Sequence, residues 1–174
     1  MRIVQITMEF APFAKAGGLG EVLVGLCREL SHQKAKVELI LPKYPFISAH
    51  SLTHLKKELE FKSPEWEHSI SNTIYSALSE DCDLRLLETQ HPKNYFNRGS
   101  IYGFEDDIPR FLFFARAVLE YFKIKNEPID ILHLHDWHGA ALAPLLRELH
   151  PEIPIKKIVL SIHNLEYQGL CSIA

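Results

Sequence analysis

The sequence predicts an α/β fold in which helices cover both faces of an open, mostly parallel sheet. Apolar strand-like runs alternate with amphipathic helix-like runs along most of the 174 residues, as is typical of parallel strands joined by helical crossovers. A glycine-rich turn joins the first strand to the first helix, and polar clusters follow two later strands. The turn and the clusters therefore lie at the carboxyl ends of the strands, which is the edge where open sheets of this kind bind ligands.

The first unit consists of a strand at residues 2–8, a loop at 9–19 and a helix at 20–31. A second strand at 36–41 ends at Pro42. Strand, helix and strand in this order predict a right-handed βαβ unit. The helix has an apolar stripe at helical spacing, which consists of Leu23, Leu26 and Leu30.

The middle of the chain is less regular. Residues 48–68 are polar and give no clear pattern, whereas 69–75 and 83–87 have strand character and flank a predicted turn at 79–81. We expect a hairpin-like insertion here. Residues 90–103 form a predicted loop with aromatic side chains that we expect to be exposed, namely Tyr95, Phe96 and Tyr102.

Residues 106–123 predict a helix, because acidic residues and an early proline occupy its first turn. A short strand follows at 130–135, then a helix rich in leucine, and a last strand at 157–162 that we expect to be buried. The helix predicted at 106–123 has apolar residues spaced for one buried face, which are Phe111, Phe114, Val118 and Phe122.

Composition narrows the possible functions. A net charge of −3 argues against a general nucleic-acid binder. No signal peptide and no apolar run of ~20 residues is recognisable, so we expect a cytoplasmic protein without a membrane span. The three cysteines, Cys27, Cys82 and Cys171, are far apart in the sequence, which agrees with a reduced compartment.

The glycine-rich turn has Lys15 on its rim and the start of a helix directly after it. Free backbone N–H groups and the positive end of the helix dipole favour phosphate at such a place. The dinucleotide-binding fingerprint is incomplete, because Leu23 stands where its third glycine belongs. From spacing alone, an anion site and an ordinary loop explain the turn equally well.

Polar residues also gather after two later strands. Asp136 and His138 follow one strand, and His163 and Asn164 follow the next. Because the carboxyl ends of parallel strands meet at one edge, we expect these residues and the glycine-rich turn to form one site.

Each of these residues also has a simpler explanation. Asp136 is equally well explained as the N-cap of the following helix. His133 alternates with His135 on one strand face, which favours a structural histidine, and Trp137 favours packing. A metal site of His133, His135 and His138 resembles metallohydrolase motifs only loosely, because Asp136 directly follows the second histidine.

Four motifs resemble those of bacterial glycogen synthases and plant starch synthases. They are the acidic-aromatic segment with Lys-Ala-Gly-Gly-Leu at 9–20, a Tyr-Gly…Asp…Arg-Phe segment at 102–111, the His-x-His-Asp-Trp-His signature at 133–138, and His-Asn-x-x-Tyr-Gln-Gly at 163–169. They stand in the family's order and span nearly the whole chain, so the chain is identified as a member of this family.

The resemblance implies a GT-B fold, whose two Rossmann-like domains flank the active site. It also implies transfer of glucose from ADP-glucose to the non-reducing end of an α-1,4-glucan with retention, without a metal or other cofactor. The implied catalytic residues are His163 and Asp136, and the implied substrate-binding residues are Lys15, Gly17, Gly18, Glu9, Glu21, Tyr102 and Asn164.

Within that set, the resemblance implies that Lys15 and the backbone of Gly17 and Gly18 face the donor phosphates and sugar. Glu21 departs from the family pattern, in which many members have Asp, and its extra methylene shifts the expected nucleotide contact. Family members also have a second domain, whose Arg and Lys bind the diphosphate. We therefore expect residues 1–174 to be a truncated N-terminal catalytic domain that is inactive without its C-terminal nucleotide-binding domain.

Two other functions remain open at this point. One is a non-catalytic module that binds glucan or nucleotide, and the other is a metal-dependent hydrolase that uses His133, His135 and His138. The choice between ADP-glucose and UDP-glucose also remains open.

Overall fold

The computed structural model describes residues 1–79 and 81–170. Its strands are β1 (Arg2–Ile6), β2 (Lys36–Pro42), β3 (Thr53–Glu65), β4 (His68–Leu78), β5 (Asp83–Thr89), β6 (Ile129–His135) and β7 (Ile155–Ser161). Its helices are α1 (Leu19–His32), α2 (Asp107–Lys125), α3 (Asp136–Ala140) and α4 (Leu142–Leu149), with a 3₁₀ turn at η1 (Ala49–Ser51).

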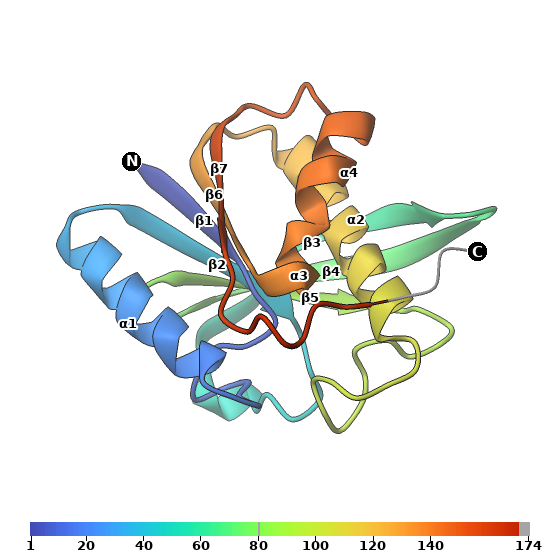
Figure 1. Cartoon of the computed structure of the whole chain (residues 1–174), viewed down its shortest axis with the longest axis horizontal. Coiled ribbons are helices and arrows are strands. Elements are labelled where there is room, and N and C mark those ends of the chain that lie inside the picture. The colour runs from blue at the N-terminus through green and yellow to red at the C-terminus, as the bar shows by residue number, and fades with distance from the viewer. Residues whose placement is uncertain (80, 171–174) are drawn as a thin grey trace.

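The strands form one sheet in the order β3-β4-β5-β2-β1-β6-β7. The chain starts at β1, moves outward to β2 on one side, and later crosses through α2 to β6 on the other side of β1. Right-handed crossovers in opposite directions place α1 on one face and α2 on the other. Figure 1 shows this arrangement, with α3 and α4 beside α2. The predicted α/β fold with covered, mostly parallel strands is confirmed.

The strand order reverses between β1 and β6, which both pair in parallel with their neighbours. A reversal of this kind opens a crevice at the carboxyl ends of the strands, because the helices on its two sides lie on opposite faces. The loop after β1 and the start of α3 both lie at this reversal. The topology therefore places two of the four sequence motifs next to each other.

The middle section forms the predicted hairpin-like insertion, but with a strand that the sequence pattern did not reveal. Strand β3 pairs antiparallel with β4, and β4 pairs antiparallel with β5. Most side chains of β3 are exposed or half-buried, because it is the outer strand on that side of the sheet. Polar outer strands of this kind lack a clear apolar alternation. Of the predicted turn at 79–81, residue 80 lies outside the described residues.

The predicted exposure of the aromatic residues in the 90–103 loop is wrong. Tyr95 and Phe96 are only 1% and 2% exposed, and Tyr102 is half-buried. The fully buried guanidinium of Arg110 donates a hydrogen bond to the carbonyl of Tyr95 at 3.2 Å and one to the carboxylate of Asp107 at 2.9 Å. A buried charge needs such partners, and the loop folds onto α2 to supply them.

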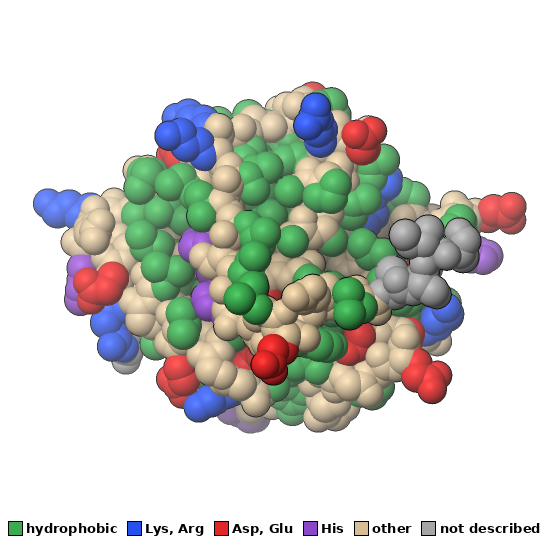
Figure 2. Space-filling view, in the orientation of Figure 1, with side chains coloured by type: hydrophobic (Ala, Val, Ile, Leu, Met, Phe, Trp, Pro, Cys, Tyr) green, Lys and Arg blue, Asp and Glu red, His purple; other side chains and the backbone are tan. Residues whose placement is uncertain are grey.

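Strand β7 is not the buried strand that its apolar sequence predicts. Ile158, Val159 and Leu160 are 43%, 41% and 46% exposed, because β7 is the outer strand of the described sheet and pairs with β6 alone. Hydrophobic side chains gather over the middle of the face shown in Figure 2. The predicted buried stripe of α2 is confirmed, and further positions of that helix, such as Phe113 and Tyr121, are buried as well.

No helix within residues 1–79 and 81–170 has both the length and the apolar character needed to cross a membrane. Cys27 and Cys82 are buried free thiols. Cys171 lies outside the described residues.

Candidate active site

A pocket of about 500 Å³ lies at the carboxyl edge of the sheet, beside the N-terminus of α1. It collects residues from all four sequence motifs. The predicted site residues that line it are Glu9, Gly17, Gly18, Tyr102, Asp136, His163 and Asn164. The structure therefore brings together predicted site residues that lie up to 155 positions apart in the sequence, from Glu9 to Asn164.

Glu9 is the central acceptor of the pocket wall, and it is 3% exposed. Its Oε2 accepts hydrogen bonds from the backbone N–H groups of Ala16 and Gly17, both at 2.8 Å. Its Oε1 accepts one from the hydroxyl of Tyr102 at 3.0 Å. Burial, and then the charge of Glu9, raise the pKa of Tyr102, so the phenol stays a donor. One carboxylate thus fixes both the glycine-rich loop and the tyrosine.

These bonds change the expected role of the glycine-rich turn. The N–H of Gly17 donates to Glu9, so this group is already occupied on the protein side. Gly20 has a packing role, because a Cβ at this position would lie 3.2 Å from the backbone nitrogen of Ala11. Gly18 lines the pocket and directly precedes α1, where the first N–H groups of the helix have no intrahelical partner.

Lys15 and Glu21 are not part of the pocket lining. The Lys15 ammonium lies 2.7 Å from the Glu21 carboxylate, and their side chains are 50% and 60% exposed. Exposed ion pairs contribute little to stability, so this pair can exchange for another partner at low cost. The two residues predicted to contact the donor nucleotide therefore neutralise each other beside the pocket.

Asp136 does not cap its own helix, so the N-cap hypothesis is wrong. It is the first residue of α3, and its φ of +54° lies in the left-handed region. No side-chain cap hydrogen bond is present at this helix start. Instead, its Oδ1 accepts hydrogen bonds from the backbone N–H groups of His163 at 2.7 Å and Asn164 at 3.3 Å. Asp136 thus holds the segment that follows β7.

The histidines of the 133–138 signature divide into two groups. The rings of His133 and His135 are 4.2 Å apart on one strand face, and His133 Nε2 lies 2.8 Å from the hydroxyl of Ser161. His138 instead packs among aromatic rings, 4.9 Å from Tyr102 and 4.2 Å from Trp137 between centroids. Among residues 1–79 and 81–170, no group of three or more His, Cys, Asp or Glu has a geometry that could hold a metal ion.

His138 and Tyr167 also line the pocket, and they are the aromatic lining residues that were not among the predicted site residues. Burial lowers the pKa of His138 to about 3, so the ring is neutral. The Tyr167 hydroxyl donates to Asp107 at 3.1 Å, and Asp107 also pairs with the buried Arg110. Both residues belong to the recognised motifs, so the motifs themselves were the sequence signal that could have identified them as site residues. Trp137 packs edge-on against Phe111, as predicted.

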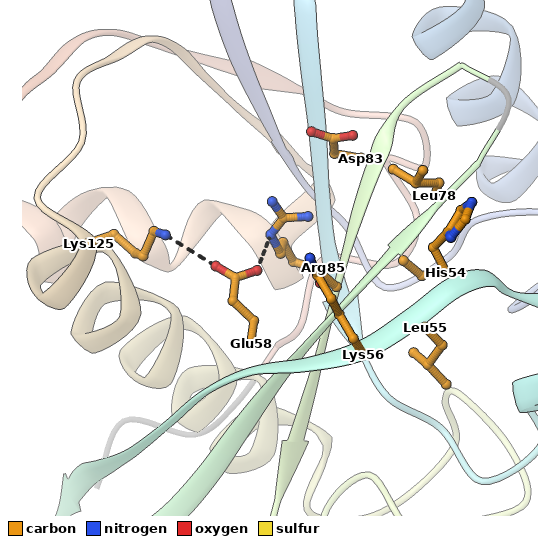
Figure 3. A pocket seen from close by; sticks show the side chains of 10 residues that line it. His54, Leu55, Lys56, Glu58, Leu78, Asp83, Arg85 and Lys125 are labelled. Carbon is orange, nitrogen blue, oxygen red and sulfur yellow. Dashed lines mark ion pairs between the residues drawn. The ribbon is translucent and has the colours of Figure 1, made fainter.

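A larger cavity of about 750 Å³ lies at the opposite, amino edge of the parallel strands, between β3, β4, β5 and the end of α2. Figure 3 shows the Glu58 carboxylate between the Arg85 and Lys125 side chains. The Glu58 carboxylate lies 2.8 Å from Arg85 Nε and 3.3 Å from Lys125 Nζ. None of the predicted site residues lines this cavity, so the smaller pocket is the candidate active site.

Comparisons with known proteins show the family to which the chain is related. A family model described as "Starch synthase catalytic domain" matches residues 2–174. The glycogen synthase of Protochlamydia amoebophila is 40% identical over 99% of this chain, and that of Bacillus subtilis is 38% identical over 98%. The chain spans 35% of the length of each of these relatives.

A solved structure shows the same similarity in three dimensions. The catalytic domain of starch synthase IV from Arabidopsis thaliana, bound to ADP and acarbose, superposes with a TM-score of 0.91 at 37% identity. The match covers 97% of this chain and 35% of that one. Because the family model matches residues 2–174 and the fold agrees with that of a starch synthase, the chain belongs to the starch synthase catalytic domain family.

Proposed function

We propose that this chain forms the acceptor-side half of an enzyme that transfers glucose from ADP-glucose to the non-reducing end of an α-1,4-glucan, with retention, and that its pocket receives the glucosyl unit of the donor. The observation that carries the proposal is the single pocket in which residues from all four family motifs meet. Relatives named glycogen synthase and a structural neighbour bound to ADP and acarbose support the substrate classes.

The pocket suits a sugar better than a free anion. Its polar side chains include carboxylates, an amide, phenols and imidazoles, for example Glu9, Asn164, Tyr102 and His163. These groups supply the mixture of donors and acceptors that sugar hydroxyl groups need. In the proposal, His163 and Asp136 act at the reacting glucosyl unit, while Glu9, Tyr102, Gly17, Gly18 and Asn164 shape its binding site.

The departing diphosphate needs positive charge that this pocket does not supply by itself. A leaving diphosphate gains negative charge as the glycosidic bond breaks, and preorganised cations stabilise it. The described lining contains neither Lys nor Arg, and Lys15 lies beside it, paired with Glu21. We propose that Lys15 exchanges Glu21 for the diphosphate. Further cations would come from a second, nucleotide-binding domain, for which the greater length of the relatives leaves room.

The proposal includes a cytoplasmic location and no cofactor. The free thiols of Cys27 and Cys82 are the form expected in a reducing compartment. A metal-dependent hydrolase would need His133, His135 and His138 around one ion. The ring of His138 instead packs against Tyr102 and Trp137, so the geometry gives that alternative no support.

The experiment uses a hybrid enzyme that joins residues 1–174 to the part of the Protochlamydia glycogen synthase that the chain does not match. We expect ADP release from ADP-glucose in the presence of glycogen for the hybrid, and none for residues 1–174 alone. A stronger reaction with UDP-glucose would contradict the choice of donor. A hybrid that binds ADP-glucose and glycogen without releasing ADP would favour the non-catalytic module.

A further inference from the structure

A chain of hydrogen bonds runs from the middle of the sheet to the pocket. His135 Nε2 lies 2.7 Å from the side-chain oxygen of Gln5, and His135 Nδ1 lies 3.0 Å from Nε2 of His163. Gln5 is fully buried and His135 is 1% exposed, whereas His163 is exposed and lines the pocket. The chain therefore connects a buried amide in β1 to a side chain that a ligand can reach.

Three neighbouring strands make this arrangement possible. Strands β1, β6 and β7 are adjacent and parallel, with Gln5 opposite His133 and His135 opposite Ser161. Side chains two positions apart on a strand share a face, so the ring of His135 reaches back to Gln5. His163 follows β7 by two residues and approaches His135 from the other side.

The donor in each bond follows from the chemistry of its atoms. The Gln5 side-chain oxygen can only accept, so His135 Nε2 must carry a hydrogen. Burial, together with the neighbouring His133 and His163, lowers the pKa of His135 to about 3, so this ring is neutral. A neutral imidazole has one N–H and one lone pair. The lone pair is then on His135 Nδ1, and it requires an N–H on His163 Nε2.

We propose that Gln5 and His135 are positioning residues that hold His163 as the Nε2–H tautomer and leave its Nδ1 as a hydrogen-bond acceptor for a ligand in the pocket. Asp136 fixes the backbone of His163 by accepting a 2.7 Å hydrogen bond from its N–H. His163 is thus held at both its backbone and its ring, and only Nδ1 stays available.

The tautomer decides which ligand group His163 can recognise. An acceptor at Nδ1 pairs with a sugar hydroxyl that donates its O–H, and it offers no donor to a phosphate oxygen. This assignment to a hydroxyl of the donor sugar rests on the proposed function, whereas the tautomer itself does not. If the Gln5 amide faced His135 with its NH₂ group instead, every bond would reverse and His163 Nδ1 would carry the hydrogen.

The test is a spectroscopic measurement on residues 1–174 with ¹⁵N-labelled histidine at neutral pH. Two-bond ¹H–¹⁵N correlations distinguish protonated from unprotonated ring nitrogens, and His135→Gln and His163→Gln assign the signals. We expect protonated Nε2 and unprotonated Nδ1 in both rings. A His163 ring that carries its hydrogen on Nδ1 would overturn the proposal, whether or not the hybrid enzyme is active.

The role of Gln5 is tested with Gln5→Leu, which removes the acceptor at the buried end. Without this acceptor, nothing favours the hydrogen on His135 Nε2 over Nδ1, so both His135 and His163 should become mixtures of tautomers. The matched control is Ile3→Val, which truncates a side chain on the same face of β1 and should leave the His163 spectrum unchanged. If Gln5→Leu also leaves the His163 tautomer unchanged, Gln5 is not a positioning residue.

Discussion

Asp136 accepts a hydrogen bond from the backbone N–H of His163 at 2.7 Å, although the two residues are 27 positions apart. Asp136 follows β6 and His163 follows β7, so this bond ties together the ends of two adjacent parallel strands. A carboxylate that accepts backbone N–H groups makes a charge-assisted bond, which is stronger than a neutral one. The acidic residue of the signature therefore shapes the pocket through the segment that it holds.

This relationship predicts different effects for two substitutions of Asp136. Asp136→Ala should lower the free energy of unfolding by about 1–3 kcal/mol, because the N–H of His163 loses its acceptor. Asp136→Asn should cost less, since it keeps an oxygen acceptor and tolerates positive φ. Urea denaturation of residues 1–174 measures both. Equal losses for the two variants would mean that the hydrogen bond does not matter.

Tyr102 should matter for activity as well as for stability, because its hydroxyl donates to Glu9 in the pocket wall. Tyr102→Phe should lower the free energy of unfolding by about 1 kcal/mol and reduce kcat/KM of the hybrid enzyme. Tyr121→Phe is the matched control, because it removes a similar bond to Glu58 at 3.1 Å, away from the pocket. A similar activity loss in both variants would contradict a specific role for Tyr102.

Lys15→Ala should reduce kcat/KM of the hybrid enzyme by roughly 10²–10³, the effect of removing about 2–4 kcal/mol of electrostatic stabilisation. Its stability should change little, because the Lys15–Glu21 pair is exposed. Lys15→Arg should recover only part of the activity, since a planar guanidinium replaces a compact charge. Steady-state kinetics with Lys62→Ala as the exposed-lysine control tests this. A loss of less than about threefold, well under 1.36 kcal/mol, would show that Lys15 is only a solvated loop residue.

His163→Ala should lower turnover of the hybrid enzyme strongly while leaving its thermal midpoint nearly unchanged. The reason is that His163 lines the pocket with an exposed side chain, so its removal creates no buried cavity and water can replace its ring as the donor to His135 Nδ1. Thermal unfolding and ADP release measured on the same sample check both parts, with the exposed His68→Ala as control. A loss of stability that parallels the loss of activity would instead indicate a structural histidine.

The buried histidines predict that the chain loses stability as the pH falls. Burial is the main reason that the pKa values of His135 and His138 are lowered to about 3, whereas an unfolded histidine titrates near about 6.5. Between these values the unfolded state binds more protons, so the free energy of unfolding decreases as the pH falls from about 6.5 toward about 3.

The measurement is urea denaturation of residues 1–174 at several pH values in this range. Carboxylates add their own pH dependence, so the informative quantity is the difference between the wild type and His138→Gln. The variant should show a shallower slope, by close to one bound proton. Identical slopes would mean that His138 titrates in the folded chain much as it does in the unfolded one.

The sequence by itself determined the order of the elements apart from β3, and it indicated the place of the candidate site. Periodicity and turn residues predict strands and helices because each side chain's face depends on local geometry alone. The motifs from Glu9 to Gly169 were recognisable as family signatures, and the carboxyl ends of parallel strands must share an edge. Almost all predicted site residues accordingly line one pocket, with Lys15 and Glu21 beside it.

The tertiary structure decided which partner each polar group has. Glu9 accepts a hydrogen bond from the N–H of Gly17, and Asp136 accepts one from the N–H of His163. Lys15 forms an ion pair with Glu21. Buried polar groups must find partners in their surroundings, and those partners depend on which strands become neighbours. The strand order also places β7 at the outside of the described sheet, where its apolar side chains are exposed. Tertiary packing buries the loop residues Tyr95 and Phe96. Gln5 and His135 stand 130 positions apart, and only the adjacency of β1 and β6 makes them a pair.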